Sequence, residues 1–307
     1  MATMRLWFVL LFSFLIGTLA PFSFSQQSSS EQSSSATPGM QGILLGTGFP
    51  APDPERAGPS NAVLVGEKVF IVDTGRGVML RLSAVESRPS RVDAVFLTHL
   101  HSDHTADLPD LFTTTWIVGR SKPLELYGPK GVREAADGVE KFLAADIHIR
   151  RDLTEMLPAA GAEINAHVVH PGVVYDDGEV KVIAFAVDHE PVNPAFGYRF
   201  ESHGRVIVFS GDYHPHEDTV SAVKGADVLV SEVYVPEYFG REGGAVAERL
   251  RRYHCTPEQA AELAQKAGVK KLVFTHIIPP FASDQIVERA RKLFSGEVVA
   301  GTDLMRF

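Results

Sequence analysis

The chain has 307 residues, of which 45% are hydrophobic and 22% are charged, and its formal net charge at pH 7 is −9. This composition is that of a soluble globular protein with enough apolar residues for a sizeable core. The acidic balance opposes a role in coating nucleic acid, because the phosphate backbone requires clustered Lys and Arg, and no basic stretch stands out.

The N-terminal segment, residues 1–25, has the pattern of a secretory signal peptide. Arg5 precedes an apolar stretch at 6–20, and Ser23 and Ser25 place small residues just before Gln26. We therefore expect cleavage before Gln26, a periplasmic or secreted protein, and no stable membrane insertion after cleavage. An uncleaved membrane anchor is the alternative, although the apolar stretch is short for a membrane-spanning helix.

A single folded domain is expected at 41–307, after a disordered linker at 26–40 that is rich in Ser and Gln and has no apolar periodicity. Cys255 is the only cysteine, so no internal disulfide stabilises this domain. Apolar runs separated by Gly and Pro predict the first elements. Strands are predicted at 43–48, 61–65 and 69–72, and a helix at 78–85.

The loop after the next predicted strand, 92–97, carries most of the chemical information in the sequence. It reads His-x-His-x-Asp-His, with His99, His101, Asp103 and His104 in these places. His99 and His101 are two residues apart, so an extended backbone points both imidazoles to the same side. Asp103 and His104 follow directly and are aimed at a second position nearby. This donor set favours zinc, and iron or manganese would also be held; the alternative is a polar loop that happens to be rich in His.

The remaining chain alternates between helical and strand-like patterns. Residues 146–178 are mixed, and their histidines, His148, His167 and His170, are interpreted as surface or packing residues because no ligand pattern accompanies them. Helices are predicted at 106–118, 131–144, 257–267 and 284–293, and strands at 124–127, 180–187, 197–200, 205–209 and 226–230.

The metal-ligand loop at the end of a strand resembles that of the metallo-β-lactamase superfamily. The resemblance implies an α/β fold, a four-layer αβ/βα sandwich in a single domain, that binds two Zn²⁺ ions or other divalent transition metals. It also implies that Asp73 supports a ligand histidine, whereas the sequence alone allows Asp73 to cap the helix at 78–85. The implied metal ligands are His99, His101, Asp103, His104, His189, Asp212 and His276, with Asp212 bridging the two ions.

Several segments resemble ribonuclease Z, a branch of this superfamily. These are residues 45–48, 196–199 and 253–262. The resemblance implies that His254 lies beside the metals and that Glu232 supports it, although Cys255 stands where that branch has Ser. Ribonuclease Z commonly carries a long tRNA-binding arm after its Gly-Tyr-Arg segment. Only residues 200–204 separate that segment from the next predicted strand, so the arm is absent and tRNA processing is not expected.

A closer resemblance is to the arylsulfatase-like group of ribonuclease-Z-type enzymes, through residues 52–59, 108–111, 126–129 and 171–175. It implies an exported dinuclear-zinc hydrolase that cleaves aryl sulfate esters through a metal-bound hydroxide. Its expected partner is a small anionic ester and not nucleic acid, and a homodimer is left open. A phosphodiesterase or other ester hydrolase of the same branch is the alternative, and a metal-binding protein without catalysis is the third.

The resemblance also assigns catalytic roles to Asp103, His254 and Glu232. Asp103 is expected to orient or deprotonate the attacking water. His254, supported by Glu232, is expected to stabilise anionic oxygens or to protonate the leaving group. The residues that would distinguish a sulfate from a phosphate ester are those of the pocket wall, because both esters carry one negative charge on a tetrahedral centre. Four aromatic residues are candidates for that wall, with loop packing as the alternative: Tyr213, His214, His216 and Tyr253.

Overall fold

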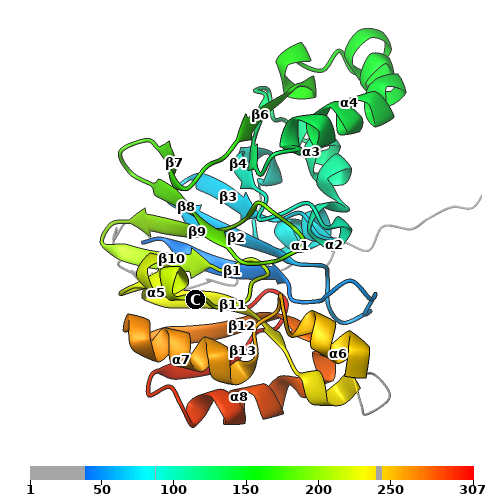
Figure 1. Cartoon of the computed structure of the whole chain (residues 1–307). Helices are drawn as coiled ribbons and strands as arrows, with labels where there is room; N and C mark the ends of the chain where they lie inside the picture. Colours follow the sequence, from blue (N-terminus) through cyan, green and yellow to red (C-terminus); the bar gives the residue numbers. More distant parts are fainter. Residues whose placement is uncertain (1–38, 87, 240–243) are drawn as a thin grey trace, which may run out of the picture. The chain divides into compact units, whose positions relative to one another are not determined.

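The computed structural model of the chain describes residues 39–86, 88–239 and 244–307 (Figure 1). The predicted signal peptide at 1–25 and nearly all of the predicted linker at 26–40 lie outside the described residues. Among the helices that are described, none is both long and apolar enough to cross a membrane.

The first half of the domain forms a six-stranded sheet in which neighbouring strands follow the order of the chain. The first three strands pair antiparallel, and the last four pair parallel. The carboxyl end of β4 therefore lies among other strand ends at one edge of the sheet. The strands are β1 (Gln41–Gly46), β2 (Ser60–Val65), β3 (Lys68–Val72), β4 (Val92–Phe96), β5 (Leu124–Gly128) and β6 (Ile164–Val168).

The second half forms a seven-stranded sheet in the order β13-β12-β11-β10-β9-β8-β7. Strands β7 to β10 pair antiparallel, and strands β10 to β13 pair parallel. The strands are β7 (Gly172–Asp176), β8 (Lys181–Val187), β9 (Ala195–Ser202), β10 (Arg205–Phe209), β11 (Val228–Tyr234), β12 (Lys271–Ile278) and β13 (Glu297–Ala300).

Three buried clusters hold the layers together. One lies between the two sheets, where Phe96 of β4 packs against Tyr198 and Phe200 of β9 with ring centroids 5.3 and 5.5 Å apart. Such aromatic pairs contribute about 0.5–1.5 kcal/mol beyond their burial. The other two clusters join each sheet to its own helices, so the predicted four-layer αβ/βα sandwich is confirmed.

The helices of the first half are α1 (Val78–Val85), α2 (Ser102–Thr105), α3 (Leu108–Ile117) and α4 (Val132–His148). Those of the second half are α5 (Glu217–Val223), α6 (Gly244–Leu250), α7 (Pro257–Ala267) and α8 (Ser283–Arg291). Helix α1 has the predicted bounds, and the helix predicted at 106–118 is α3, which begins two residues later with Pro109 in its first turn. The mixed stretch 146–178 contains β6 and β7, which the sequence pattern does not separate because both strands are at most half-buried.

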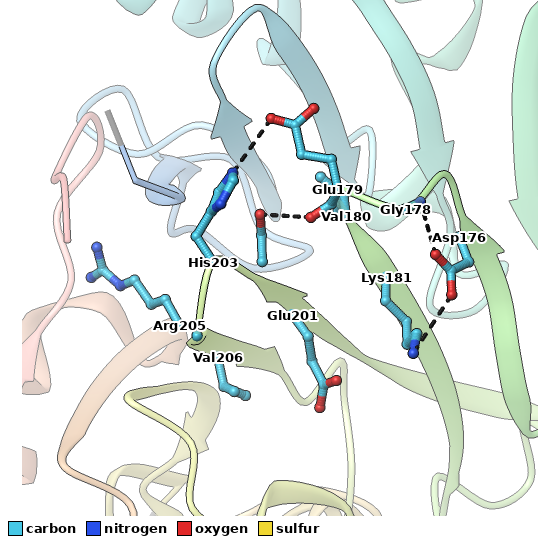
Figure 2. Close-up of a pocket in the computed structure, with 11 residues that line it drawn as sticks. Asp176, Gly178, Glu179, Val180, Lys181, Glu201, His203, Arg205 and Val206 are labelled. Carbon is cyan, nitrogen blue, oxygen red and sulfur yellow. Dashed lines mark hydrogen bonds and ion pairs between the residues drawn. The ribbon is translucent and has the colours of Figure 1, made fainter. Parts of the chain in front are cut away.

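A surface cavity of about 550 Å³ lies between the β7–β8 turn and the β9–β10 turn (Figure 2). Its carboxylates have cationic partners. Lys68 lies 2.6 Å from Asp177 and 2.7 Å from Glu179. Arg199 lies 2.6 Å from Glu201, which lines the cavity. The carboxylates of this region are thus paired with neighbouring cations, so we interpret the cavity as structural.

Candidate metal centre

The predicted metal ligands come from four strand ends that meet at one edge of the paired sheets. The loop after β4 carries His99, His101, Asp103 and His104, and His189 follows β8 by two residues. Asp212 follows β10 after a tight turn at Gly211, where φ is 64° and an added Cβ would lie 2.8 Å from a backbone oxygen of β9. The turn therefore requires Gly.

His276 reaches the centre through a β-bulge within β12. The pairing with β11 shifts by one residue at this point, because Glu232 pairs with Thr275 and Val233 pairs with Ile277. His276 is thus the extra residue, and its φ is 44°. A bulge of this kind re-aims one side chain, which explains how a residue inside a strand faces the loop after β4.

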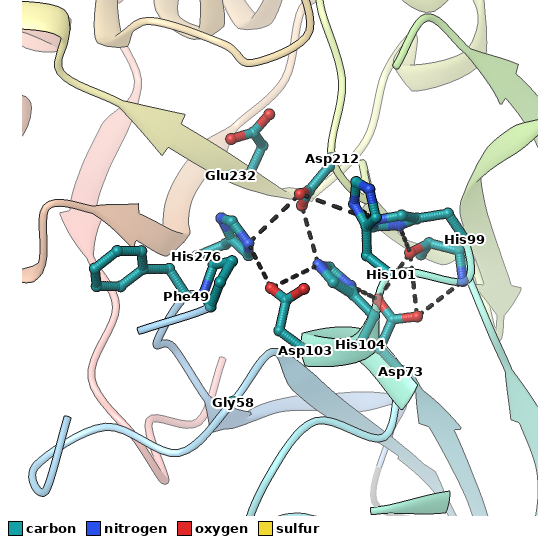
Figure 3. A network of polar contacts seen from close by, with 12 residues as sticks. Phe49, Gly58, Asp73, His99, His101, Asp103, His104, Asp212, Glu232 and His276 are labelled. Carbon is teal, nitrogen blue, oxygen red and sulfur yellow. Dashed lines mark hydrogen bonds and ion pairs between the residues drawn. The ribbon is translucent and has the colours of Figure 1, made fainter. Parts of the chain in front are cut away.

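The first group of donor atoms comprises His99, His101, His189 and Asp212. Figure 3 shows three of them, His99, His101 and Asp212. Nδ1 of His101 lies 3.0 Å from Nε2 of His99 and 3.3 Å from Nε2 of His189. Oδ2 of Asp212 lies 4.0 Å from Nε2 of both His99 and His189. His101 is exposed while the other three are buried, so the group is open to solvent on the side of His101.

The second group comprises Asp103, His104 and His276. Nε2 of His276 lies 3.3 Å from Oδ2 of Asp103 and 3.4 Å from Oδ2 of Asp212. Nε2 of His104 lies 3.6 Å from Oδ2 of Asp103 and 3.4 Å from Oδ1 of Asp212. Asp212 therefore lies between the two groups, as a bridging ligand would.

This donor set fits divalent cations. Nε2 of His104 and Oδ1 of Asp212 are buried and have no hydrogen-bond partner among the described residues. Leaving such atoms unpaired costs free energy, whereas each has a lone pair that a cation would accept. Among the described residues, Asp103 and Asp212 form ion pairs with histidines and with no Lys or Arg, so their charges are not neutralised by a permanent cation. Imidazole and carboxylate together suit zinc and other divalent transition metals.

Hydrogen bonds on the outer nitrogen orient two of the predicted ligand rings, those of His104 and His189. Nδ1 of His104 donates to Asp73 at 2.9 Å, and Nδ1 of His189 donates to the backbone oxygen of Tyr253 at 2.9 Å. Asp73 also accepts from the backbone N–H of Thr98 at 2.8 Å and from its hydroxyl. Asp73 therefore supports His104, a predicted ligand, and does not cap α1, whose first residue follows Gly77 without a side-chain cap. Sequence analysis did not identify Thr98, whose only signal is its place between β4 and His99.

The electrostatics of the two groups differ. Burial lowers the pKa values of His99, His101 and His189, that of His189 to about 4, so these rings present lone pairs at neutral pH. At His104 burial acts in the same direction, but Asp212 and Asp73 outweigh it and raise the pKa. A cation at His104 would therefore displace a proton, and this couples metal affinity to pH.

His254 and Glu232 form a buried pair beside both groups. Nδ1 of His254 lies 2.9 Å from each carboxylate oxygen of Glu232. Glu232 also accepts from the backbone N–H groups of Tyr213 at 2.9 Å and Cys255 at 3.3 Å. Burial, with the charge of Asp212 added, raises the pKa of Glu232, and burial lowers that of His254. The His254 ring centroid lies 5.8 Å from that of His276, so the predicted pair is next to the predicted ligands.

The candidates for the pocket wall have different outcomes. Tyr213 is fully buried, and its hydroxyl lies 3.0 Å from that of Ser231, so for Tyr213 the loop-packing alternative is correct. Tyr253 is half-buried with its ring 5.3 Å from that of His189, at the edge of the centre. The other two candidates for the wall, His214 and His216, follow Asp212 in the chain, and His216 lines a different cavity with α5 and α7.

The histidines that were interpreted as surface or packing residues include His148 and His167. They lie away from the centre and pair with Asp152 and Glu125.

Comparisons with known proteins identify relatives across the folded region. Residues 69–277 match the family described as "Beta-lactamase superfamily domain". Ribonuclease Z of Mycobacterium bovis BCG is 38% identical over 273 residues, which cover 86% of this chain and 96% of that one. Ribonuclease Z of Mycobacterium marinum is 37% identical with the same coverage of 86% and 96%.

Solved structures share the fold at low sequence identity. The metallo-beta-lactamase fold protein YhfI from Bacillus subtilis superposes with a TM-score of 0.69 at 20% identity, over 87% of this chain and 98% of that one. The short form of human tRNase Z superposes with a TM-score of 0.66 at 23% identity, again over 87% and 98%. At these identities the likeness concerns the fold alone.

Two predictions are wrong in the light of these relatives: the aryl sulfate ester as substrate, and a small-molecule partner without nucleic acid. The relatives that match over 86% of the chain are named ribonucleases. The absent arm does not separate this chain from them, because coverage of 86% and 96% over 273 residues leaves no room for an arm in only one of the two chains. The net charge was misleading because it is a sum over the surface and does not describe the rim of one site.

Proposed function

We propose that this chain, which belongs to the metallo-β-lactamase superfamily in its ribonuclease-Z-like branch, is a metal-dependent phosphodiesterase that hydrolyses RNA. The chain is a metallo-hydrolase by family; the RNA substrate is the inference. One observation supports it most strongly: Asp212 of the first group lies 3.4 Å from both His104 and His276 of the second, and the His254–Glu232 pair lies directly beside them. Two-metal sites of this kind serve in-line displacement at phosphorus.

The proposed ligands are the seven residues of the two groups, with one divalent ion in each and zinc as the expected ion. When bound, such ions would neutralise charge on the phosphoryl oxygens and lower the pKa of water. The exposed side of His101 is the direction from which a substrate would approach. The proposed ligands are His99, His101, His189, Asp103, His104, His276 and the shared Asp212.

The other roles follow from the geometry of the side chains. Oδ2 of Asp103 lies 3.3 Å from Nε2 of His276 and faces the metal centre, which leaves Oδ1 of Asp103 to orient or deprotonate the attacking water. The Nδ1 atom of His254 is fixed by Glu232, which leaves Nε2 to donate to the leaving oxygen or to an anionic oxygen. A ribose alkoxide is a poor leaving group, so RNA hydrolysis needs this proton more than hydrolysis of a phenyl ester does.

The experiment that tests the function compares four substrates on metal-verified protein: single-stranded RNA, single-stranded DNA, bis(p-nitrophenyl) phosphate and p-nitrophenyl sulfate. RNA and the phosphate diester should be hydrolysed, and His101→Ala should lose metal and both activities together. His148→Ala is the matched control, because His148 is an exposed histidine whose partner is Asp152. Metal-loaded protein that hydrolyses neither RNA nor the diester would overturn the proposal.

We also propose export, on the pattern of residues 1–25 alone. Mass spectrometry of protein expressed in its source organism should find a mature N-terminus near Gln26. Protein from the cytoplasm that still begins at Met1 or Ala2 would contradict export, without bearing on the chemistry of the metal centre.

A further inference from the structure

Three exposed arginines lie at the rim of the metal centre in a chain whose net charge is −9. Arg249 belongs to the last turn of α6, and Arg251 and Arg252 follow it directly. Of these three arginines, only Arg251 has an ion-pair partner among the described residues, and its Nε atom lies 3.8 Å from a carboxylate oxygen of Glu248. A carboxylate at that distance on an exposed surface neutralises little, so the segment presents local positive charge.

In the chain, the arginines come directly before residues of the metal centre. Arg252 is followed by Tyr253, whose backbone oxygen accepts from Nδ1 of His189, and then by His254. The ring of Tyr253 lies 4.8 Å from that of His254. The backbone N–H of Arg252 donates to the backbone oxygen of Arg249 at 3.1 Å, so the arginines lie on one turn directly before Tyr253.

Two exposed aromatic side chains lie on neighbouring loops at the same edge of the sheet. Tyr238 is 46% exposed and Phe281 is 72% exposed, and their ring centroids are 4.9 Å apart in an edge-to-face arrangement. Tyr238 lies on η4 (Pro236–Phe239), which follows β11, and Phe281 lies on η5 (Pro280–Ala282), which follows β12. These two strands also carry Glu232 and His276. Large aromatic side chains are seldom exposed in pairs without a binding role.

The loops that carry the aromatic pair and the arginines are fixed to one another. Helix α6 packs against η4, and the hydroxyl of Tyr234 in β11 donates to the backbone oxygen of Ala247 in α6 at 3.0 Å. Arg289 of α8 lies 3.0 Å from Glu237, next to Tyr238, and 2.6 Å from Glu258 of α7. The aromatic pair and the arginines are therefore held on adjacent, anchored elements.

We propose that Tyr238, Phe281, Arg249, Arg251 and Arg252, hereafter the rim strip, bind a single-stranded RNA segment beside the phosphodiester that is cleaved. This inference rests on the proposed function. Arginines neutralise backbone phosphates, and exposed aromatic rings stack on unpaired bases. Stacking requires splayed bases, so the rim strip favours single-stranded RNA over a duplex. The strip lies next to His254, which places the bound strand within reach of the metal centre.

The test uses the metal-loaded full chain and a single-stranded RNA of roughly a dozen nucleotides, long enough for several stacked bases. The kcat/KM for this RNA is measured over a range of salt concentrations, and hydrolysis of bis(p-nitrophenyl) phosphate is measured on the same preparations. Arg249→Ala/Arg252→Ala should lower kcat/KM for RNA about 10-fold, mainly through KM, and should lose more on RNA than on the small diester. The slope of log kcat/KM against log salt should fall by about 1.4, or 0.7 for each lost phosphate contact.

Phe281→Ala should lower kcat/KM for RNA about fivefold or more without changing the salt slope, because stacking is not electrostatic. Arg150→Ala/Arg151→Ala removes the same charge from η2 (Ile149–Leu153), on the first half of the domain, and should leave both parameters unchanged. Wild-type protein that cleaves RNA while both rim variants match the control would overturn the rim strip alone. Wild-type protein that cleaves neither RNA nor the diester would overturn the proposed function instead.

Discussion

At one end of the second sheet, Asp212 and His276 lie among histidines, and at the other end Asp177 and Glu179 lie beside Lys68. Both regions gather carboxylates and a histidine at strand ends, and the second also has the larger cavity. In the second region each of these carboxylates has an ammonium group within 2.7 Å. In the first, buried oxygen and nitrogen atoms remain without hydrogen-bond partners among the described residues.

The comparison indicates that buried polar atoms without hydrogen-bond partners distinguish a ligand site from a structural cluster better than cavity size or acidic composition does. Ion pairs at the surface satisfy their own charges and contribute little to stability. Buried groups without partners cost free energy in the absence of a ligand and recover it when a ligand binds. Substitutions of similar side chains at the metal centre and at the far cavity should therefore have different effects.

Removal of the shared carboxylate should have the largest effect. Asp212→Ala should lower the metal content of purified protein towards zero and reduce kcat for RNA and for bis(p-nitrophenyl) phosphate by about 10³-fold or more, because several kcal/mol of charge stabilisation depend on the metals. Plasma mass spectrometry and initial rates measure the two effects. The matched variant Asp176→Ala removes a carboxylate from the other end of the sheet and should change neither. Equal losses in the two variants would show that the two ends do not differ as described.

Removal of the His254 imidazole should leave the metals in place and slow the chemistry. His254→Ala should lower kcat by about 10²–10⁴-fold, the usual range for a positioned acid–base group. The loss should be smaller for diesters with more acidic leaving phenols, so a plot of log kcat against leaving-group pKa should be steeper for the variant. Equal slopes would assign His254 to stabilisation of anionic oxygens, and unchanged kcat would remove it from the mechanism. His203→Ala, at the other end of the sheet, is the control.

Removal of the negative charge of Asp73, which accepts a hydrogen bond from the proposed ligand His104, should have a moderate effect. Asp73→Asn keeps the size of the side chain but weakens the hydrogen bond from His104, so metal affinity should fall about 10–100-fold. Competition with a chromogenic chelator measures this affinity. Glu179→Gln is the same change of charge at the far cavity, where Lys68 is the partner, and should leave metal affinity unaltered. An Asp73→Asn affinity equal to that of wild type would mean that His104 does not depend on Asp73.

Removal of a cation from the far cavity should have the smallest effect. Lys68→Ala should destabilise the domain by about 0–1 kcal/mol and leave metal content unchanged. Burial raises the pKa of Asp177. The hydrogen bonds from Lys68 and from the backbone N–H of Val180 outweigh burial and hold this pKa below its usual range. The stabilisation is therefore present above the ordinary pKa of an aspartate and is lost as pH falls through the depressed value. Urea unfolding of both proteins at neutral and acidic pH should show the difference shrinking in acid; a difference that grows in acid would contradict this origin.

Sequence patterns predicted the fold where an element is buried on one face or on both. Helix α1 and strands β3 and β4 were predicted within one or two residues of their bounds, because their apolar runs are short and bounded by turns. Strands β6 and β7 were not separated, because their partly exposed residues do not alternate clearly. Strand β13 (Glu297–Ala300) was missed because it has only four residues, too few to show an alternating pattern.

The candidate site was predictable to the extent that its residues follow strand ends. The loop after β4 indicated four of the proposed ligands and the family resemblance the other three, but the supporting groups depend on contacts that no local pattern specifies, such as Thr98 with Asp73 and His189 with the backbone of Tyr253. The substrate class was predicted incorrectly because short segments that resemble another group, the absent arm and the net charge of the whole chain were taken to define it. The rim arginines at 249–252 are too few to alter that sum, although they gather at one place.

The bulge at His276 also affects how the chain tolerates changes of length. Residues 271–275 pair with β11 in one register, and Ile277 and Ile278 pair in the next. Deletion of Thr275 would restore regular pairing with Ile277 still opposite Val233, and would place His276 opposite Glu232, where the bulge no longer re-aims its side chain. By contrast, the turn at His203 and Gly204 is exposed and joins two strands that could lengthen together. Insertions should therefore accumulate at the β9–β10 turn, whereas the number of residues from Thr275 to Ile277 should be fixed.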